Sequence, residues 1–341
     1  MTSELLLSVR DLRTYFHTDA GVVKAVDGVS FDVAPGEIFG IVGESGSGKS
    51  ITAMSILGLV QIPPGRVESG KILWQGRDLL TCSEAEMRGI RGGEIGMIFQ
   101  DPLSALNPVY TVGAQIAEMI LAHQSVSKRS AHARAIEMLT LVGIPRAVQR
   151  AEDFPHQFSG GMRQRAMIAM ALANEPKLLI CDEPTTALDV TIQAQVLEVI
   201  EKSARELGAA IVLITHDLGV VAGMVDRVAV MYGGKIVEEA VVDDLYERPR
   251  MPYTWGLLSS IPRLDDTTGR RLDPIPGVPP NPRKFPDGCR FHPRCTFAVD
   301  QCRTELPELK PLADVGERHF ARCHRTSEVD WATKSPKLES S

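Results

Sequence analysis

A buried strand that runs into a glycine-rich loop and then into a helix constrains this chain more than any other segment. Ile38–Val42 reads Ile-Phe-Gly-Ile-Val, as expected for a strand that is buried on both faces of a sheet. The loop Gly43–Ser50 reads G-x-x-x-x-G-K-S, and residues 49–60 follow a helical pattern. Glycines let the backbone wrap closely around phosphate oxygens, and the helix adds the positive end of its dipole. The segment therefore predicts a phosphate-binding site.

Each position of this loop has an expected role. The Lys49 ammonium neutralises the β- and γ-phosphates, and the Ser50 hydroxyl binds Mg²⁺. Successive backbone N–H groups point at phosphate oxygens, because the glycines leave room for them. The residues predicted to contact the nucleotide in this segment are Gly43, Glu44, Ser45, Gly46, Ser47, Gly48, Lys49, Ser50 and Ile51.

Two acidic residues mark the end of a second strand-like run, residues 177–182. Asp182 is the last residue of the run, where it can hold Mg²⁺ through water. Glu183 comes next, so its side chain points elsewhere, and we expect it to polarise the attacking water. The alternative is that either carboxylate simply caps a loop.

Two further polar residues follow strand-like segments. His216 comes after residues 210–215, and Gln100 comes after residues 95–99. Neighbouring parallel strands end at the same edge of a sheet. We therefore expect His216 near the γ-phosphate and Gln100 near Mg²⁺ and the water. The competing interpretation of His216 is a purely structural histidine.

The order of the predicted elements indicates an α/β fold. Residues 4–33 alternate apolar and polar, which is typical of antiparallel strands, and buried strands then alternate with helices, which favours a largely parallel sheet. A helical insert, residues 101–158, interrupts this core. Gly233 and Gly234 predict a two-residue hairpin. Helices beyond the phosphate loop are expected over residues 112–123, 131–142, 160–174 and 191–207.

Composition excludes several classes of protein. The chain has 341 residues, of which 44% are hydrophobic and 23% charged, so it can bury a large core. A net charge of −6 gives no reason to expect nucleic acid as a partner. No apolar run approaches the ~20 residues that span a bilayer, and Glu4 interrupts the start too early for a signal peptide. We expect a soluble chain whose membrane role requires other subunits.

Four of the six cysteines fall in a tract that is close to a proline-rich stretch. Their spacing, C-x₅-C-x₆-C-x₂₀-C, lacks the close pair that is usual for structural zinc. Four thiolates can hold a [4Fe–4S] cluster, and a loose zinc site or four free thiols are the alternatives. The cysteines are Cys289, Cys295, Cys302 and Cys323, and the arginines expected to offset cluster charge are Arg290, Arg294, Arg303 and Arg322.

A further motif completes an ordered set. Ser159-Gly160-Gly161-Met162 precedes a helical pattern, and with the phosphate loop and the acidic pair it resembles the ATP-binding cassette (ABC) superfamily, whose signature loop usually reads S-G-G-Q. Met162 replaces the glutamine, and we expect function to survive, because serine and backbone N–H groups supply the phosphate contacts. The resemblance implies that Phe16 stacks on adenine, that Ala187-Leu188-Asp189 is the D-loop and that His216 is the switch histidine.

The chain beyond residue 250 indicates which branch of the superfamily this chain resembles. Its segments 248–254 and 274–280, followed by the cysteine tract, are similar to the tail of dipeptide/oligopeptide importer ATPases. The resemblance favours a [4Fe–4S] cluster in this tract. It also implies ATP and Mg²⁺ at the separate nucleotide site. The expected organisation is an ABC-type nucleotide-binding domain (1–250) with an antiparallel β subdomain and a helical subdomain (about 101–158), a C-terminal extension (251–325) and a disordered tail (326–341).

The resemblance also implies a working assembly. ATP on the phosphate loop is completed by the signature loop of a partner ATPase in a head-to-tail dimer, and hydrolysis reopens the dimer. Expected partners are a paralogous ATPase, two membrane permeases and an extracytoplasmic peptide-binding protein, with the chain on the cytoplasmic face of the membrane and no nucleic acid bound. An identical partner ATPase, nickel or glutathione as the solute, and a soluble ABC ATPase uncoupled from transport are the alternatives.

Overall fold

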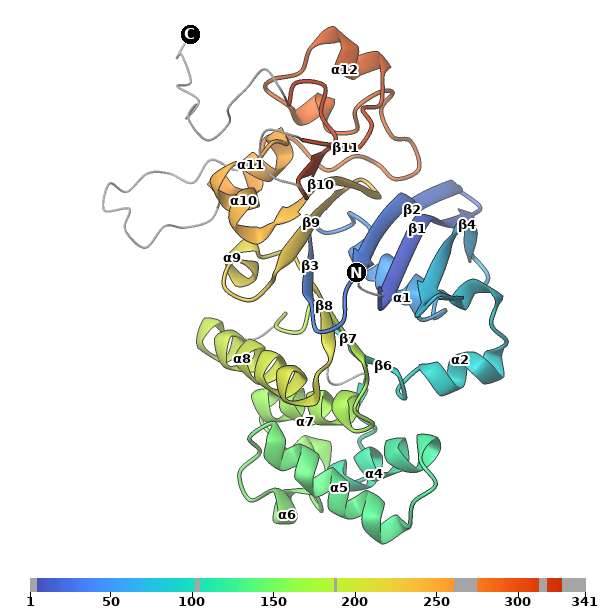
Figure 1. Ribbon diagram of the computed structural model, residues 1–341, viewed down its shortest axis with the longest axis vertical. Coiled ribbons are helices and arrows are strands. Elements are labelled where there is room, and N and C mark those ends of the chain that lie inside the picture. Colours follow the sequence, from blue (N-terminus) through green and yellow to red (C-terminus); the bar gives the residue numbers. More distant parts are fainter. Residues whose placement is uncertain (1–4, 102–104, 187–188, 261–274, 313–317, 327–341) are drawn as a thin grey trace, which may run out of the picture. The chain divides into compact units, whose positions relative to one another are not determined.

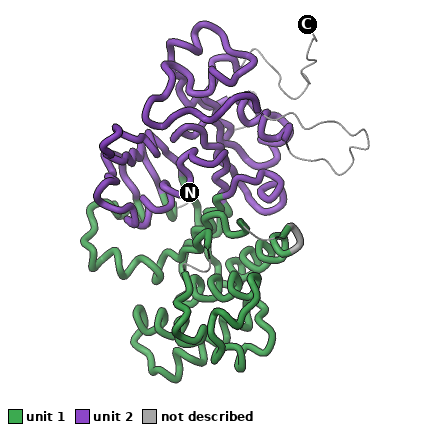
Figure 2. The backbone as a smooth tube through the Cα atoms, turned by 180° about the vertical axis from the view of Figure 1, so that it is seen from behind, with its two compact units in different colours: residues 1–7, 32–38, 73–214 green, residues 8–31, 39–72, 215–341 purple. Residues whose placement is uncertain are grey.

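The computed structural model describes residues 5–101, 105–186, 189–260, 275–312 and 318–326. The chain divides into two compact units, which are green and purple in Figure 2. Unit 1 comprises residues 1–7, 32–38 and 73–214, and unit 2 comprises residues 8–31, 39–72 and 215–341. Each unit is therefore assembled from segments that are far apart in the sequence.

Three parallel strands form the sheet of unit 1. They are β6 (Ile95–Ile98), β7 (Leu178–Asp182) and β8 (Ala210–Thr215), in the order β8-β7-β6. Every residue of β7 and β8 is buried, which explains why both sequences are almost continuously apolar. The predicted parallel sheet is confirmed for these strands.

The rest of unit 1 is mainly helical (Figure 1). The predicted helix at residues 112–123 is confirmed, whereas α5 begins at residue 128 rather than 131, because Ser127 accepts a hydrogen bond from the Ser130 N–H (3.1 Å) and caps the helix. The predictions omit α2, although Ser83 and Glu86 form a capping box at its start. The helices are α2 (Glu84–Ile90), α4 (Val112–His123), α5 (Lys128–Leu141), α6 (Ala147–Arg150), α7 (Gly160–Leu172) and α8 (Val190–Leu207), with short 3₁₀ turns η1 (Leu79–Thr81) and η2 (Pro155–Gln157).

An N-terminal sheet of long strands lies mainly in unit 2. Strands β1 (Leu7–Thr18) and β2 (Gly21–Val33) confirm the prediction for residues 4–33. The sheet order is β2-β1-β4-β5, in which β4 (Gly65–Trp74) was not predicted and β5 (Arg77–Asp78) pairs antiparallel with the end of β4.

The second sheet of unit 2 has the order β11-β12-β10-β9-β3. Strand β3 (Ile38–Val42) pairs in parallel with β9 (Arg227–Tyr232), and β9 pairs antiparallel with β10 (Lys235–Val241). Gly233 and Gly234 join β9 to β10 with φ of 54° and 80°, a left-handed pair that suits a tight hairpin. The predicted hairpin is confirmed.

Helix α1 (Lys49–Ile56) follows the phosphate loop and is shorter than the predicted span of residues 49–60. Leu57 is its C-cap, and Gly58 takes a φ of 61°. A left-handed glycine just beyond the last turn is a common way to end a helix. The helical pattern in the sequence therefore extends beyond the point where the glycine stops the helix.

The described part of the C-terminal extension belongs to unit 2. Its strand β12 pairs antiparallel with β10, so the extension adds strands to the edge of the sheet. The Tyr232 ring on β9 lies 4.5 Å from the Tyr253 ring and 5.3 Å from the Phe291 ring, centroid to centroid. Residues 261–274 and the predicted tail from residue 327 lie outside the described residues. The elements from β10 onward are α10 (Val242–Glu247), α11 (Pro252–Ser259), η3 (His292–Arg294), α12 (Asp300–Thr304), β11 (Lys310–Pro311) and β12 (Phe320–Ala321).

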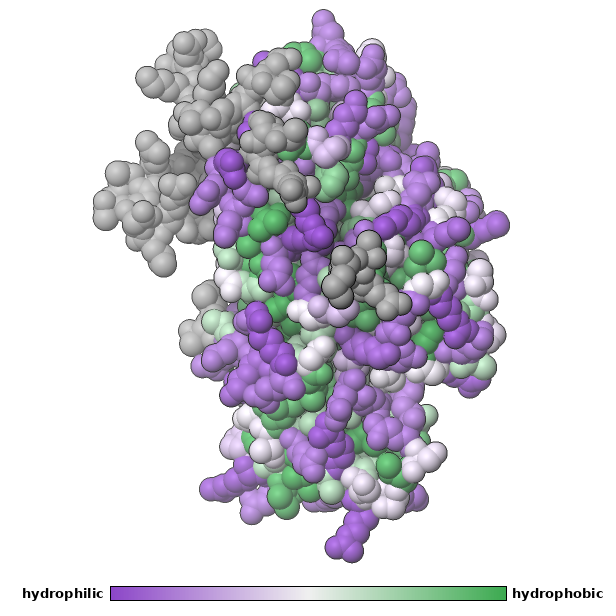
Figure 3. Space-filling view, viewed as in Figure 1, coloured by the Kyte–Doolittle hydropathy of each residue, from purple (hydrophilic) through white to green (hydrophobic). Residues whose placement is uncertain are grey.

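Within the described ranges, no helix has both the length and the apolar character needed to cross a membrane. On the face drawn in Figure 3, hydrophilic side chains lie among hydrophobic ones. The largest fully buried side chains include Tyr232, Tyr253 and Phe39.

Candidate functional site

Two glycines of the phosphate loop lie where other backbone segments of unit 2 pass close by. Gly43 has a φ of +153°, and a Cβ there would lie 2.2 Å from the Met231 carbonyl oxygen. Gly48 has a φ of +108°, and a Cβ there would lie 2.3 Å from the Ala25 carbonyl oxygen. Neither position can take a side chain without a shift of the backbone. Gly46, with a φ of +77°, has open space around it.

Lys49 is the first residue of α1, and its ammonium is buried inside the loop. Nζ donates to the carbonyl oxygens of Gly43 (2.8 Å) and Glu44 (3.1 Å). Ser47 is also buried, and its hydroxyl has no hydrogen-bond partner among the described residues. A buried cation, an unsatisfied hydroxyl and a helix N-terminus are groups that bind an anion. This arrangement fits the phosphate contacts predicted for the loop, which Ser50 and Ile51 continue into the helix.

Glu44 is held by two residues of the C-terminal extension that the motif does not reveal. Its backbone N–H donates to the Tyr253 hydroxyl (2.9 Å). Its carboxylate accepts two hydrogen bonds from Arg294, Nη1 to Oε2 at 2.6 Å and Nη2 to Oε1 at 2.9 Å, and this contact raises the pKa of Arg294. Arg294 is thus paired with a carboxylate of the phosphate loop, a partner that the sequence analysis did not identify.

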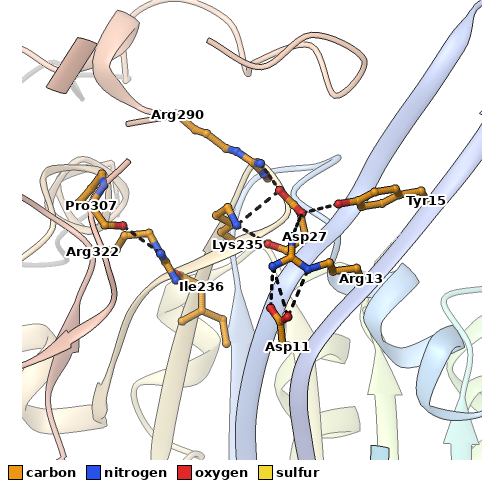
Figure 4. A network of polar contacts seen from close by, with 10 residues as sticks. Asp11, Arg13, Tyr15, Asp27, Lys235, Ile236, Arg290, Pro307 and Arg322 are labelled. Atoms are coloured by element: carbon orange, nitrogen blue, oxygen red, sulfur yellow. Dashed lines mark hydrogen bonds and ion pairs between the residues drawn. The ribbon is translucent and has the colours of Figure 1, made fainter. Parts of the chain in front are cut away.

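Asp27 on β2 is the centre of a second link to the extension (Figure 4). Its carboxylate accepts hydrogen bonds from Tyr15 Oη (2.6 Å), Arg13 Nη1 (3.1 Å) and Arg290 Nη2, and Lys235 Nζ lies 3.5 Å away. Burial alone would raise the pKa of Asp27. The Tyr15 hydrogen bond and the charges of Lys235 and Arg290 outweigh burial and hold this pKa well below its ordinary value. Arg290, like Arg294, therefore binds a carboxylate.

In unit 1, Glu183 directly follows β7 and has a φ of +47°, which residues other than glycine seldom adopt. Its Oε2 accepts hydrogen bonds from Gln100 Nε2 (3.2 Å) and Thr186 Oγ1 (2.9 Å). Gln100 and Glu183, predicted separately from two strand ends, are therefore in direct contact. Gln100 is exposed and Asp182, the last residue of β7, is buried. Strained backbone of this kind is concentrated at functional sites.

The segment Ser159–Met162 begins helix α7. Ser159 is the N-cap, and its hydroxyl accepts a hydrogen bond from the Met162 N–H (3.3 Å). Further along the helix, Gln164 Nε2 donates to the Pro184 carbonyl oxygen (2.5 Å), next to Glu183. The segment presents a helix N-terminus, as expected of a loop that contacts phosphate.

Other predicted residues lie elsewhere in the two units. Phe16 lies in β1 and is partly exposed, and His216 follows β8 and is exposed. Asp217 then caps the short helix α9 (Leu218–Val221). The phosphate loop belongs to unit 2, and Asp182 and Glu183 belong to unit 1. Contacts predicted between these two sets stay predictions.

The predicted D-loop is only partly described. Ala187 and Leu188 lie outside the described residues. Asp189 is the N-cap of α8, where its carboxylate accepts a hydrogen bond from the Ile192 N–H (3.0 Å). A local structural role therefore accounts for Asp189 in this chain.

The four clustered cysteines line one cavity of the extension, together with His292 and His324. All four are free thiols, and burial raises the pKa of Cys295 to about 11 and that of Cys323 to about 12. Among the described residues, no group of three or more histidines, cysteines or acids is arranged to hold a single metal ion. The structure therefore brings the four thiols of the tract to one cavity.

Comparisons with known proteins agree with this geometry. The ABC transporter profile matches residues 26–186, and the profile of the oligopeptide/dipeptide transporter C-terminal region matches residues 237–302. The chain is 51% identical over 317 residues to the oligopeptide transport ATP-binding protein OppD of Bacillus subtilis (strain 168), which covers 93% of this chain and 88% of that protein. It is 53% identical over 325 residues to OppD of Mycobacterium tuberculosis (strain ATCC 25618 / H37Rv), of which it spans 52%.

The solved structures include a similar cassette. The dimeric, post-hydrolysis structure of the ATP-binding cassette MJ0796 bound to ADP and Pi matches with a TM-score of 0.62 and 26% identity, covering 69% of this chain and 98% of that chain. Fold, site and comparisons together define an ATPase of the ABC class. Within that class, the chain belongs to the family of oligopeptide/dipeptide transporter ATP-binding subunits.

Proposed function

We propose that this chain hydrolyses ATP to drive the import of dipeptides and oligopeptides through a multi-subunit ABC transporter. One observation carries the proposal: a single chain matches both the ABC transporter profile and the oligopeptide/dipeptide C-terminal profile, and resembles OppD of Bacillus subtilis over most of both lengths. Import of nickel or glutathione by the same architecture is the alternative for the solute.

The phosphate loop is proposed to bind the nucleotide through Gly43–Ser50 and Ile51, with Phe16 against the adenine. Support comes from the buried Lys49 ammonium and the unsatisfied Ser47 hydroxyl at the start of α1. Ser50 and Gln100, with Asp182 through water, are the residues that would hold Mg²⁺, which neutralises phosphate charge when bound.

Glu183 is proposed to act as the general base that polarises the attacking water. Support comes from its place directly after a buried strand and from the hydrogen bonds of Gln100 and Thr186, which orient its carboxylate. His216 is proposed to sense the γ-phosphate from the end of β8.

The segment Ser159–Met162 is proposed to complete the nucleotide site of a partner ATPase in a head-to-tail dimer. The helix N-terminus at Ser159 supports this role, as does the similarity to a cassette whose solved structure is dimeric. We propose a paralogous partner, two permeases, an extracytoplasmic peptide-binding protein and attachment to the cytoplasmic membrane face through the permeases. In this scheme residues 1–250 are the ATPase domain, residues 101–158 relay motion, and residues 251–325 are the extension.

The cysteine tract is proposed to hold a [4Fe–4S] cluster through Cys289, Cys295, Cys302 and Cys323. The shared cavity supports this, because it brings the four thiols together, and a loose zinc site is the alternative. Iron and sulfide analysis of the anaerobically purified chain is expected to find about four irons, which are lost in Cys302→Ser. Zinc in their place, or no metal at all, would refute the cluster.

The transport function is tested on the assembled complex in vesicles, with ATP on the side of the ATPase and binding protein with solute on the other. We expect ATP-dependent uptake of dipeptides or oligopeptides and its loss in Lys49→Ala. Uptake of Ni²⁺ or glutathione without peptide uptake would select the alternative solute. Full ATPase activity of the chain alone, unaffected by permeases or solute, would identify an uncoupled ATPase.

A further inference from the structure

The phosphate loop itself carries a carboxylate, on a residue whose backbone contacts the proposed phosphate-binding cation. Glu44 follows Gly43 directly, and the Glu44 carbonyl oxygen accepts a hydrogen bond from Lys49, the proposed phosphate-binding cation. An uncompensated negative charge at this position would repel the triphosphate. The structure therefore raises the question of what neutralises Glu44.

Arg294 supplies the opposite charge in a two-point contact. The Arg294 side chain is only 5% exposed, whereas the Glu44 side chain is 27% exposed. Nε also donates to the Pro276 carbonyl oxygen (2.8 Å), and Nη1 lies 3.4 Å from the Tyr232 hydroxyl. These contacts therefore hold the guanidinium in place independently of Glu44. Arg294 can in turn fix the position of the Glu44 carboxylate.

Tyr253 acts on the backbone of the same residue. The peptide group between Gly43 and Glu44 is held at both edges, because its N–H donates to the Tyr253 hydroxyl (2.9 Å) and its carbonyl oxygen accepts from Lys49 (2.8 Å). Tyr253 is fully buried and packs against Tyr232. A rigid aromatic side chain of the extension thus orients the peptide group that contacts the phosphate-binding lysine.

We propose that Arg294 and Tyr253 are positioning residues for ATP: the C-terminal extension neutralises Glu44 and orients the first peptide group of the phosphate loop. This inference rests on the proposed function of Gly43–Ser50 as the nucleotide site. It gives the extension a role in nucleotide affinity, in addition to whatever its cysteines bind.

The test measures the dissociation constant for ATP of the full-length chain in a double-mutant cycle that removes each of the two charges. Arg294→Met is expected to weaken ATP binding about tenfold, because the loop then carries an uncompensated negative charge. Glu44→Gln alone is expected to tighten binding about threefold. The double variant is expected to return to within about threefold of the wild type, and a double variant as weak as Arg294→Met would overturn the proposal.

Two further variants separate positioning from general stability. Tyr253→Phe removes only the hydroxyl and is expected to weaken ATP binding about fivefold, in line with one lost hydrogen bond. Arg227→Met is the matched control, because Arg227 on β9 is another buried arginine of unit 2 that pairs with a carboxylate, that of Glu239. It is expected to leave ATP affinity unchanged, and an equal loss in Arg227→Met would show that the effect is structural.

Salt dependence and Lys49→Ala complete the design. The defect of Arg294→Met is expected to shrink as ionic strength rises, since salt screens charge repulsion. If Arg294→Met does not fold, Arg294→Lys, which keeps the charge but loses the two-point contact, is expected to show an intermediate defect. Wild-type ATP binding by Lys49→Ala would refute the proposed nucleotide site, whereas loss in Lys49→Ala but not in Arg294→Met would refute only the present inference.

Discussion

Glu183 in unit 1 and Glu44 in unit 2 both follow a buried strand closely, yet they are supported in opposite ways. Glu183 receives hydrogen bonds from Gln100 and Thr186, neutral donors that do not cancel its charge. Glu44 is bound by Arg294, a cation that does cancel it and that lies 250 positions further along the chain. The carboxylate that is proposed to polarise water is oriented by neutral donors, whereas the carboxylate of the phosphate loop is paired with a cation.

The largest expected effect concerns Glu183, the carboxylate that neutral donors orient. Glu183→Gln is expected to slow ATP hydrolysis by about 10²–10⁴-fold while ATP still binds, because the amide preserves the shape of the side chain but cannot act as a base. Steady-state hydrolysis and equilibrium ATP binding are the two measurements. Glu206→Gln, an exposed change on α8, is the control, and near-normal turnover in Glu183→Gln would remove Glu183 from the catalytic role.

Asp27 is comparable to Glu44, because an arginine of the extension pairs with each carboxylate. The Asp27 pair is expected to matter for stability. Asp27→Asn is expected to lower the free energy of unfolding by about 3–5 kcal/mol, because Arg290 and Lys235 then lack their buried counter-charge. Denaturant unfolding measures this change. Asp19→Asn at the exposed β1–β2 turn is expected to stay within about 0.5 kcal/mol, and an equal effect of both changes would contradict the ion-pair account.

The loop glycines offer a matched pair with smaller effects. Gly43→Ala is expected to destabilise the chain by about 2–3 kcal/mol and to weaken ATP binding, because its Cβ would overlap the Met231 carbonyl oxygen. Gly46→Ala is expected to cost about 1 kcal/mol, from its positive φ alone. Thermal unfolding of both variants tests the difference, and equal costs would mean that close backbone approach does not explain the glycine pattern.

Acid stability follows from the low pKa of Asp27. Its folded-state pKa lies below the ordinary value of 3.8, so its contribution to stability is complete above about pH 4 and is lost as the pH falls through the folded-state pKa. The wild type is therefore expected to lose more unfolding free energy than Asp27→Asn as the pH falls from 5 toward 2. Parallel loss in both chains over this range would contradict the assignment.

The smallest expected effect is at the signature segment. Met162→Gln restores the usual residue of the family loop and is expected to change ATP turnover of the assembled complex by less than about threefold. The reason is that Ser159 caps α7 through the backbone N–H of residue 162, which any side chain preserves. A change larger than tenfold would show that the side chain itself contacts the nucleotide.

Local sequence patterns predict many of the helices, strands and turns of this chain. They do not predict which residues far apart in the sequence form ion pairs. The strand–loop–helix at residues 38–56, the β9–β10 hairpin and helix α4 follow from periodicity and glycine placement alone. The meeting of Gln100 with Glu183 follows from neighbouring strand ends. The Arg294–Glu44 and Arg290–Asp27 pairs do not, because an isolated arginine in the sequence carries no signal of which distant carboxylate will face it.

The pairing of β12 with β10 has a further consequence for the behaviour of the chain in a crowded cell. Without it, β10 would present unsatisfied N–H and carbonyl groups on its outer side, a template onto which a strand of another molecule could add. The outermost strand is instead β11, which has only two residues, Lys310 and Pro311. A lysine charge and a proline without an N–H make poor partners for a foreign strand, so the extension also protects the chain against aggregation.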